Sequence, residues 1–71
     1  MREIENGMTI MFKYKNWKGI TDIRMCVVEG IFYGSNAWHK EEQFLLSGFD
    51  LDKNEMRDYA MKDISDIKFT A

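Results

Sequence analysis

The sequence predicts a mainly β domain in which five short strands curl into a small barrel, with at most one short helical turn. Three observations support this prediction. Apolar and polar side chains alternate along several short segments, a pattern typical of half-buried strands. Turn residues separate these segments, and the chain contains no proline. Because the chain has only 71 residues, a flat sheet would expose too much apolar surface, so a curled sheet is favoured.

The chain length indicates a single domain. A chain of this size buries only about 60% of its unfolded surface, and its apolar fraction of 45% is enough for one small core. Asn6 and Gly7 form a turn signal. We therefore expect residues 1–7 to form an N-terminal tail and residues 8–71 to form the β domain.

The first expected strand covers residues 8–15. Its alternation places four apolar side chains on one face, namely Met8, Ile10, Phe12 and Tyr14. The alternation stops at Asn16, and residues 16–19 are predicted to form a hairpin connection. Gly19 is expected at the position of that turn which requires a positive φ.

The second expected strand covers residues 20–29 and becomes apolar on both faces toward its end, as expected for a strand that enters the core. Gly30 interrupts this strand, which resumes over residues 31–33. We interpret Gly30 as a bend or a β-bulge that lets one long strand serve two sides of a barrel. Residues 34–36 end the element.

The central expected strand covers residues 43–50, and both of its faces are predicted to be buried. The segment before it, residues 37–42, has two interpretations. It is either a helical turn with Ser35 or Asn36 as its N-cap, or a loop over the mouth of the barrel. If the segment has no catalytic role for His39, we expect a polar loop in which Trp38 caps the core.

A turn at residues 52–55 leads to an expected strand over residues 56–61. Residues 62–64 are predicted to form a short turn, of the 3₁₀ type or similar. A final strand is expected over residues 65–69. Five short strands with this little helix favour an SH3-like or Sm-like barrel.

Charge and cysteine content exclude several classes of protein. The net charge of −2 argues against non-specific binding along duplex DNA, although residues 1–24 carry a net +2 and residues 41–71 a net −4. A single cysteine, Cys26, excludes an internal disulfide and favours a packed thiol in a reducing, cytoplasmic compartment. No segment approaches the roughly 20 apolar residues of a membrane span, so no membrane partner is expected.

Neither a metal site nor a catalytic site is predicted. Residues 50–54 begin with the spacing of a calcium-binding loop, but Glu55 stands where glycine is needed and Met61 where a glutamate is needed. We therefore interpret residues 50–54 as a solvated hairpin turn. His39 has no nucleophile placed beside it. We expect no cofactor and no enzymatic activity.

Arg24 and Arg57 each lie inside an otherwise apolar or aromatic strand. A charged side chain in such a position must pair with a carboxylate or point into a cleft. In one interpretation each arginine forms a structural ion pair, for example with Asp22 or Asp58.

In the other interpretation the two arginines form an anion site. Arg57 shares a strand face with Tyr59, and aromatic side chains are expected at the edge of the site. This arrangement suits a phosphate group with a stacked base. The candidate aromatic residues are Tyr14, Tyr59 and Trp38.

Four segments and one residue of the second strand carry a family resemblance. Residues 10–19 open the β domain, and Arg24 follows in the second strand; residues 43–45 are Gln-Phe-Leu; residues 48–50 are Gly-Phe-Asp; and residues 57–64 are Arg-Asp-Tyr-Ala-Met-Lys-Asp-Ile. Over residues 9–69 the chain resembles a WYL domain, the small Sm-like barrel of bacterial and phage regulators. Such domains usually follow a helix-turn-helix, for which this chain has no room, so we expect a stand-alone domain.

The resemblance implies a ligand-sensing domain that binds nucleic acid or nucleotides through basic and aromatic side chains. This sequence departs from the family pattern in three places: Gln43 and Phe44 replace the signature Trp and Tyr, and Asp63 replaces the second arginine of the closing pattern, beside Lys62. The ligand-binding residues that the resemblance implies are Arg24, Arg57, Tyr14, Tyr59, Phe44 and Lys62.

Two functions are therefore expected. The first is a non-enzymatic regulatory or accessory protein that binds a nucleotide or a short single-stranded nucleic acid. The second is a protein–protein interaction module, either a homo-oligomer or an accessory or inhibitory subunit of a larger partner, in which the arginines are structural. Surface aromatic residues such as Trp17 and Trp38, together with the net negative charge, favour the second function.

Overall fold

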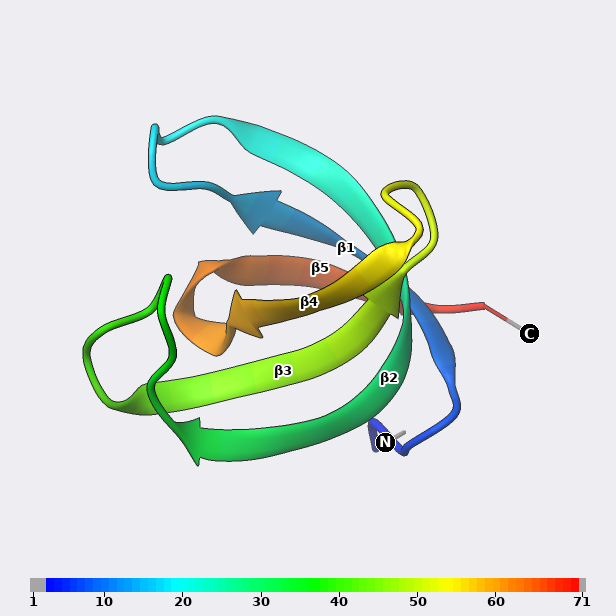
Figure 1. The fold of residues 1–71 in the computed structure, drawn as a ribbon. Coiled ribbons are helices and arrows are strands. Elements are labelled where there is room, and N and C mark those ends of the chain that lie inside the picture. Colours follow the sequence, from blue (N-terminus) through cyan, green and yellow to red (C-terminus); the bar gives the residue numbers. More distant parts are fainter. Residues whose placement is uncertain (1–2, 71) are drawn as a thin grey trace.

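The structure, a computed structural model, describes residues 3–70. It contains five strands and one 3₁₀ helix (Figure 1). The strands are β1 (Thr9–Lys15), β2 (Thr21–Gly34), β3 (Gln43–Asp50), β4 (Glu55–Ala60) and β5 (Ile64–Phe69), and the 3₁₀ helix is η1 (Met61–Asp63). The predictions of a mainly β chain and of one short helical turn are confirmed.

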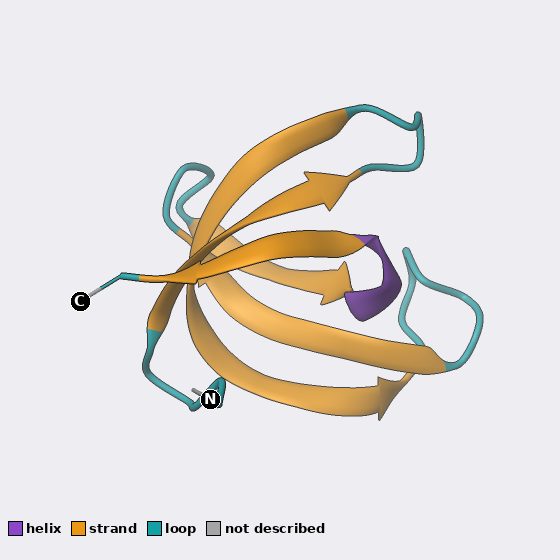
Figure 2. Cartoon of the chain, turned by 180° about the vertical axis from the view of Figure 1, so that it is seen from behind, coloured by secondary structure: helices purple, strands orange, loops and turns teal. Residues whose placement is uncertain are grey.

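All five strands form a single antiparallel sheet in the order β4-β3-β2-β1-β5. The sheet is strongly curled, and η1 connects its two edge strands, β4 and β5 (Figure 2). Within residues 3–70 no strand pairing joins β4 to β5, so the sheet does not close. The pairing thus confirms the predicted strands without establishing a closed barrel.

Strand β2 shapes the sheet because it has 14 residues and two different neighbours. It pairs with β1 over residues 21–27 and with β3 over residues 26–34. The register with β3 shifts between Val28 and Gly30, which confirms the irregularity predicted there. Residues 21–24 pair only with β1, and the carbonyl oxygen of Met25 accepts from the N–H of Leu51, directly after β3.

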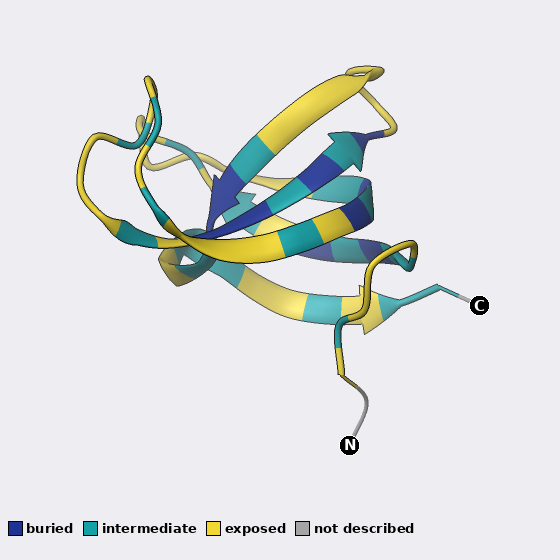
Figure 3. Ribbon diagram, turned by 60° about the horizontal axis from the view of Figure 1, so that its bottom comes forward, coloured by how far each residue is buried: buried dark blue, intermediate teal, exposed yellow. Residues whose placement is uncertain are grey.

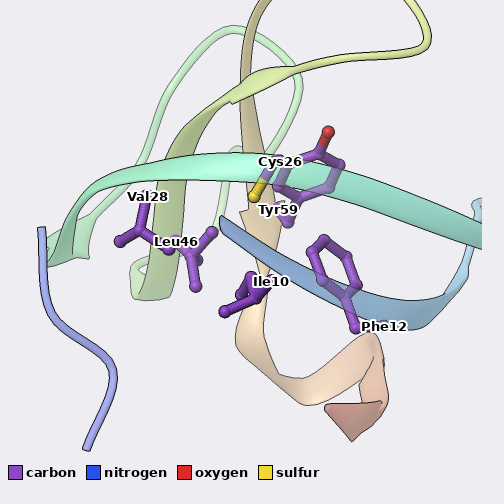
Figure 4. Close-up of a cluster of buried hydrophobic side chains, with 6 residues drawn as sticks. All are labelled: Ile10, Phe12, Cys26, Val28, Leu46 and Tyr59. Carbon is purple, nitrogen blue, oxygen red and sulfur yellow. The ribbon is translucent and has the colours of Figure 1, made fainter. Parts of the chain in front are cut away.

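The core lies inside the curl of the sheet. The predicted inner face of β1 is confirmed, since Ile10 and Phe12 are buried there. Six side chains form the main buried cluster (Figure 4): Ile10, Phe12, Cys26, Val28, Leu46 and Tyr59. The loops that connect the strands are largely exposed (Figure 3). Burial in β1 and in the middle of β2 therefore follows the apolar pattern of the sequence. In β3, Leu45 and Leu46 are both buried, but Phe44 is 60% exposed, so the prediction that both faces of this strand are buried holds only in part.

Gly48 allows β2 and β3 to approach closely beneath this cluster. A Cβ atom at Gly48 would lie 2.9 Å from the Cys26 Sγ atom and 2.9 Å from the carbonyl oxygen of Val27. Any larger residue would force the two strands apart. Gly19 has a φ of 80°, which confirms the positive φ predicted for the β1–β2 turn.

The ends of the described chain lie along the sheet. The N–H of Gly7 donates to the carbonyl oxygen of Val28 at 2.7 Å, and Ile4 packs against the core. At the other end, the N–H of Thr70 donates to the carbonyl oxygen of Thr9. Across residues 3–70, no helix is both long enough and apolar enough to cross a membrane.

Candidate functional site

A groove of about 980 Å³ is bordered by β4, by the first half of β2 and by two loops. Its lining residues are Tyr14, Lys15, Asn16, Trp17, Arg24, Trp38, His39, Gln43, Asp50, Lys53, Met56, Arg57, Asp58, Tyr59, Lys62 and Asp63. Five of the six residues proposed from the sequence line this one groove, although they come from four different elements. Register and curl therefore bring together side chains that are up to 48 positions apart in the sequence.

Phe44 is the sixth residue, and it lies outside the groove. Its side chain is 60% exposed, and its ring packs edge-on against Tyr33 with a centroid distance of 5.0 Å. Phe44 is directly opposite Tyr33 in the β2–β3 pairing, which explains this contact. A role for Phe44 in ligand binding is therefore not supported by its position relative to the groove.

The floor of the groove is built on the carboxylate of Asp50, which is only 1% exposed. The Tyr59 hydroxyl donates to Asp50 Oδ2 at 2.6 Å, and the N–H groups of Asp52 and Lys53 donate to Asp50 Oδ1, both at 2.9 Å. Asp50 thus holds the β3–β4 turn and orients Tyr59. The interpretation of residues 50–54 as a solvated turn is wrong for Asp50, because its side chain is buried.

The hydrogen bonds at the floor keep Asp50 ionised. Burial by itself would raise the pKa of the carboxyl group, but the bonds from Tyr59 and from the two backbone N–H groups, with the nearby charge of Arg24, outweigh it. The pKa of Asp50 therefore lies below its usual value. Conversely, burial and the bond to Asp50 raise the pKa of the Tyr59 hydroxyl, which stays neutral.

Two tyrosine rings form an aromatic wall above this floor. The Tyr14 and Tyr59 rings meet edge-to-face with centroids 5.1 Å apart, and Phe12 contacts Tyr59 in the same way. The N–H of Ala60 donates to the Tyr14 hydroxyl at 3.1 Å. Burial raises the pKa of Tyr14. Both rings are thus held in place by contacts within the protein.

Arg24 projects from the inner face of β2 into the groove, and its side chain is 22% exposed. Its ion pair with Asp22 is loose, with 4.0 Å between the nitrogen and the oxygen. The nearby carboxylate of Asp50 is already engaged by Tyr59 and by two N–H groups. The guanidinium of Arg24 therefore keeps donor capacity for an anion.

Arg57 lies on β4, across the groove from β2. Its guanidinium pairs with Glu55 two residues earlier on the same strand, and both side chains are about half exposed. The partner of Arg57 is thus Glu55, and neither Asp22 nor Asp58 pairs with it among the described residues. An exposed pair of this kind contributes little to stability, so an anionic ligand can compete with Glu55.

Two exposed tryptophans border the groove. Trp17 is 88% exposed in the β1–β2 loop, and Trp38 is 89% exposed in the loop between β2 and β3. The expectation that Trp38 caps the core is wrong. Residues 37–42 form an irregular loop and not a helical turn, which settles the alternative left open by the sequence.

An asparagine side chain shapes each of these loops. Asn16 Oδ1 accepts from the N–H groups of Lys18 and Ile20, at 2.9 and 3.0 Å. Asn36 Oδ1 accepts from the N–H groups of Trp38 and His39, at 2.9 and 2.6 Å. An asparagine one or two positions before a tryptophan is therefore the sequence signal that could have identified both loops.

The second loop is also fastened to β4. Asn36 Nδ2 donates to Asp58 Oδ2 at 2.7 Å, and His39 Nε2 lies 3.1 Å from the carbonyl oxygen of Asp58. These contacts use the carboxylate and the carbonyl oxygen of Asp58 and one ring nitrogen of His39. His39 thus helps to fasten this loop to β4.

The groove has a net positive charge although the whole chain is acidic. Its lining includes five basic residues and three acidic ones, Asp50, Asp58 and Asp63, for a net charge of +2. Two of the three carboxylates already accept hydrogen bonds from the protein. Within residues 3–70 no group of three or more His, Cys, Asp or Glu side chains could hold a metal ion.

A comparison of the sequence with models of protein families gives no match, and a comparison with curated proteins gives none either. Function is therefore inferred from the groove itself.

Proposed function

We propose that this protein is a non-enzymatic regulatory or accessory protein that holds a nucleotide or a short single-stranded nucleic acid in the groove. The main support for this proposal is that Arg24 and Arg57 line one groove together with Tyr14 and Tyr59. Arginine is suited to phosphate because its planar fork donates two parallel hydrogen bonds. The partly buried Tyr14 ring can offer an aromatic face to an unpaired base. The Tyr59 ring is only 4% exposed, and it supports the Tyr14 ring through their edge-to-face contact.

The balance of charge and size supports this class of ligand. A groove with a net charge of +2 on a chain with a net charge of −2 attracts a small anion but offers no extended basic surface for duplex DNA. A volume of about 980 Å³ lies at the upper end of the range for small-molecule sites. A ligand of one to a few nucleotides is consistent with both properties.

We further propose that the domain is a WYL-like member of the SH3-like or Sm-like barrels, acting in the cytoplasm as a ligand sensor. Support comes from the strand order β4-β3-β2-β1-β5, from the curl of the sheet and from the 3₁₀ helix between β4 and β5. Cys26 is a buried free thiol, in keeping with a reducing compartment. The segments that resemble WYL domains include the strands that carry Arg24 and Arg57.

A second candidate function is a protein–protein interaction module. The observation that favours it is a group of exposed apolar side chains away from the groove, namely Ile31, Tyr33 and Phe44 on β2 and β3. The open edges of β4 and β5 could also accept a strand from another chain. In this case the arginines serve only to stabilise the fold.

A thermal-shift titration with mono-, di- and oligonucleotides tests the first proposal. A ligand that binds the folded state at a hundred times its Kd stabilises it by about 2.7 kcal/mol. We expect a rise in Tm for the wild type, and a much smaller rise for Arg24→Ala and Arg57→Ala. Lys68→Ala is the matched control, because Lys68 is an exposed cation outside the groove.

Two results would contradict the proposal. One is a flat response to every nucleotide at low salt; the other is equal ligand-induced shifts in the wild type and in both arginine variants. A flat response together with a mass that rises with protein concentration would favour the interaction module instead.

A further inference from the structure

We propose that Trp17 and Trp38 each stack one base, so that the ligand of the groove is a single-stranded oligonucleotide, a dinucleotide or longer, and not a mononucleotide. This inference rests on the function proposed for the groove and specifies its ligand. It adds Trp17 to the site and gives a specific role to Trp38, which the sequence analysis expected only at the edge of the anion site.

The positions of the two tryptophans are the first support. They lie in loops at residues 16–20 and 35–42, and both line the same groove. Figures 1 and 2 show these two loops at the same end of the molecule, with η1 between them. Two indole rings thus border one cationic groove from separate loops.

The exposure of the two rings is the second support. Tryptophan is highly buried in most proteins, yet both tryptophans of this chain leave nearly all of their surface to solvent. Neither ring belongs to the buried cluster or to the partly buried side chains that pack against it. Their large apolar faces are therefore available to a ligand.

The loops also hold the backbone of each tryptophan before any ligand binds. The hydrogen bonds from Asn16 and Asn36 fix the two turns, and the bond from Asn36 to Asp58 fastens the second loop to β4. In the first loop, Lys18 Nζ lies 5.2 Å from the centroid of the Trp17 ring. A preformed site loses less conformational entropy on binding, which favours affinity.

The chemistry of the groove identifies the class of ligand. The groove combines two flat apolar indole rings with two guanidinium groups. This combination matches a polymer that alternates flat bases with anionic phosphates. A mononucleotide offers only one base and can occupy only one indole. In a duplex the base faces are stacked inside the helix. Single-stranded DNA and single-stranded RNA share the required chemistry.

Tryptophan fluorescence tests this inference. Because the chain has two tryptophans, Trp17→Ala and Trp38→Ala each leave one indole as a reporter. We expect mono-, di-, tetra- and octathymidylate to bind with increasing affinity and to quench both indoles from the dinucleotide onward. Each substitution should weaken octathymidylate binding by about 5- to 150-fold, the loss expected for one stacked base.

The control is Tyr33→Ala, which removes an exposed aromatic ring outside the groove and should leave the affinity unchanged. Trp17→Phe and Trp38→Phe should each keep part of the affinity that the alanine variants lose, since each retains an aromatic face. A parallel series of oligouridylates shows whether DNA or RNA is preferred.

The outcomes separate this inference from the function on which it rests. If thymidine monophosphate binds as tightly as the octamer, or if either alanine variant retains full affinity, the two-base arrangement is wrong while the groove remains a nucleotide site. If no nucleotide or oligonucleotide binds at low salt, both proposals fail.

Discussion

The hydroxyl of Tyr59 donates a hydrogen bond of 2.6 Å to the buried carboxylate of Asp50, and this bond joins the edge strand β4 to the end of β3. Asp50 also accepts two backbone N–H groups of the β3–β4 turn. The same carboxylate thus fixes a turn, orients an aromatic ring of the groove and balances part of the charge of Arg24. Asp50 therefore contributes both to the stability of the fold and to the geometry of the groove.

Removing either partner of this bond should destabilise the protein. We expect Tyr59→Phe and Asp50→Asn each to lower the free energy of unfolding by about 1.5–3 kcal/mol, because a bond to a buried charged group is lost. Urea denaturation measures this change. Tyr33→Phe is the control, since the Tyr33 ring is exposed, and it should change little. If the double variant lost the full sum of the two effects, the two side chains would not be coupled.

Asp50 should also contribute to acid sensitivity. Its folded-state pKa lies below the ordinary value of 3.8, so its charged form stabilises the fold above pH 3.8, and this stabilisation is lost as the pH falls through the lower folded-state pKa. Asp50→Asn should therefore lose less stability than the wild type when the pH is lowered from 5 to 2, a range set by these values. Parallel pH profiles for the two proteins would contradict this assignment.

The thiol of Cys26 should be inert in the folded state. Burial, assisted by the charge of Asp50, raises its pKa from 9.0 to about 11. The folded state holds the thiol proton more tightly than the unfolded state. The resulting contribution of Cys26 to the free energy of unfolding is complete below pH 9 and is lost as the pH rises toward 11. An aromatic disulfide reagent should react slowly at neutral pH and rapidly in urea. Fast reaction of the native protein would show that the thiol is accessible.

Gly48 should tolerate no side chain. The Cβ of alanine would lie 2.9 Å from the Cys26 Sγ atom and from a backbone oxygen, so the strands must move apart. We expect Gly48→Ala to cost about 1–3 kcal/mol of unfolding free energy. Gly34→Ala is the matched control, because its nearest contact would be an ordinary 3.6 Å from the Phe32 ring. Equal stability of the two variants would contradict close packing of β2 on β3.

The phosphate contact proposed for Arg24 should appear in the salt dependence of binding. For a single-stranded ligand, the slope of log K against log salt changes by about 0.7 for each phosphate contact. Arg24→Gln should make the slope shallower by about this amount, whereas Lys68→Gln should leave it unchanged. A weakened affinity with an unaltered slope would mean that Arg24 acts on the fold and not on a phosphate.

The strands could be predicted because their signals are local. Alternation in residues 8–15, the turn signal at Asn16 and Gly19 and the interruption at Gly30 each depend on neighbours in the sequence, and the structure contains all of them. The errors concern side chains whose surroundings are not local. Trp38 is apolar but exposed, and Asp50 is charged but buried. The burial of each side chain depends on residues that are distant in the sequence.

The sequence by itself determined the order and kind of the elements, since strand periodicity and turn chemistry act over a few residues. Only the tertiary structure decided that Arg24 and Arg57 converge on one groove while Phe44 faces away from it. That outcome depends on the pairing of β2 with two neighbours, on the bulge near Gly30 and on the curl that brings β4 across from β2. These are relations between distant segments, and no local pattern encodes them.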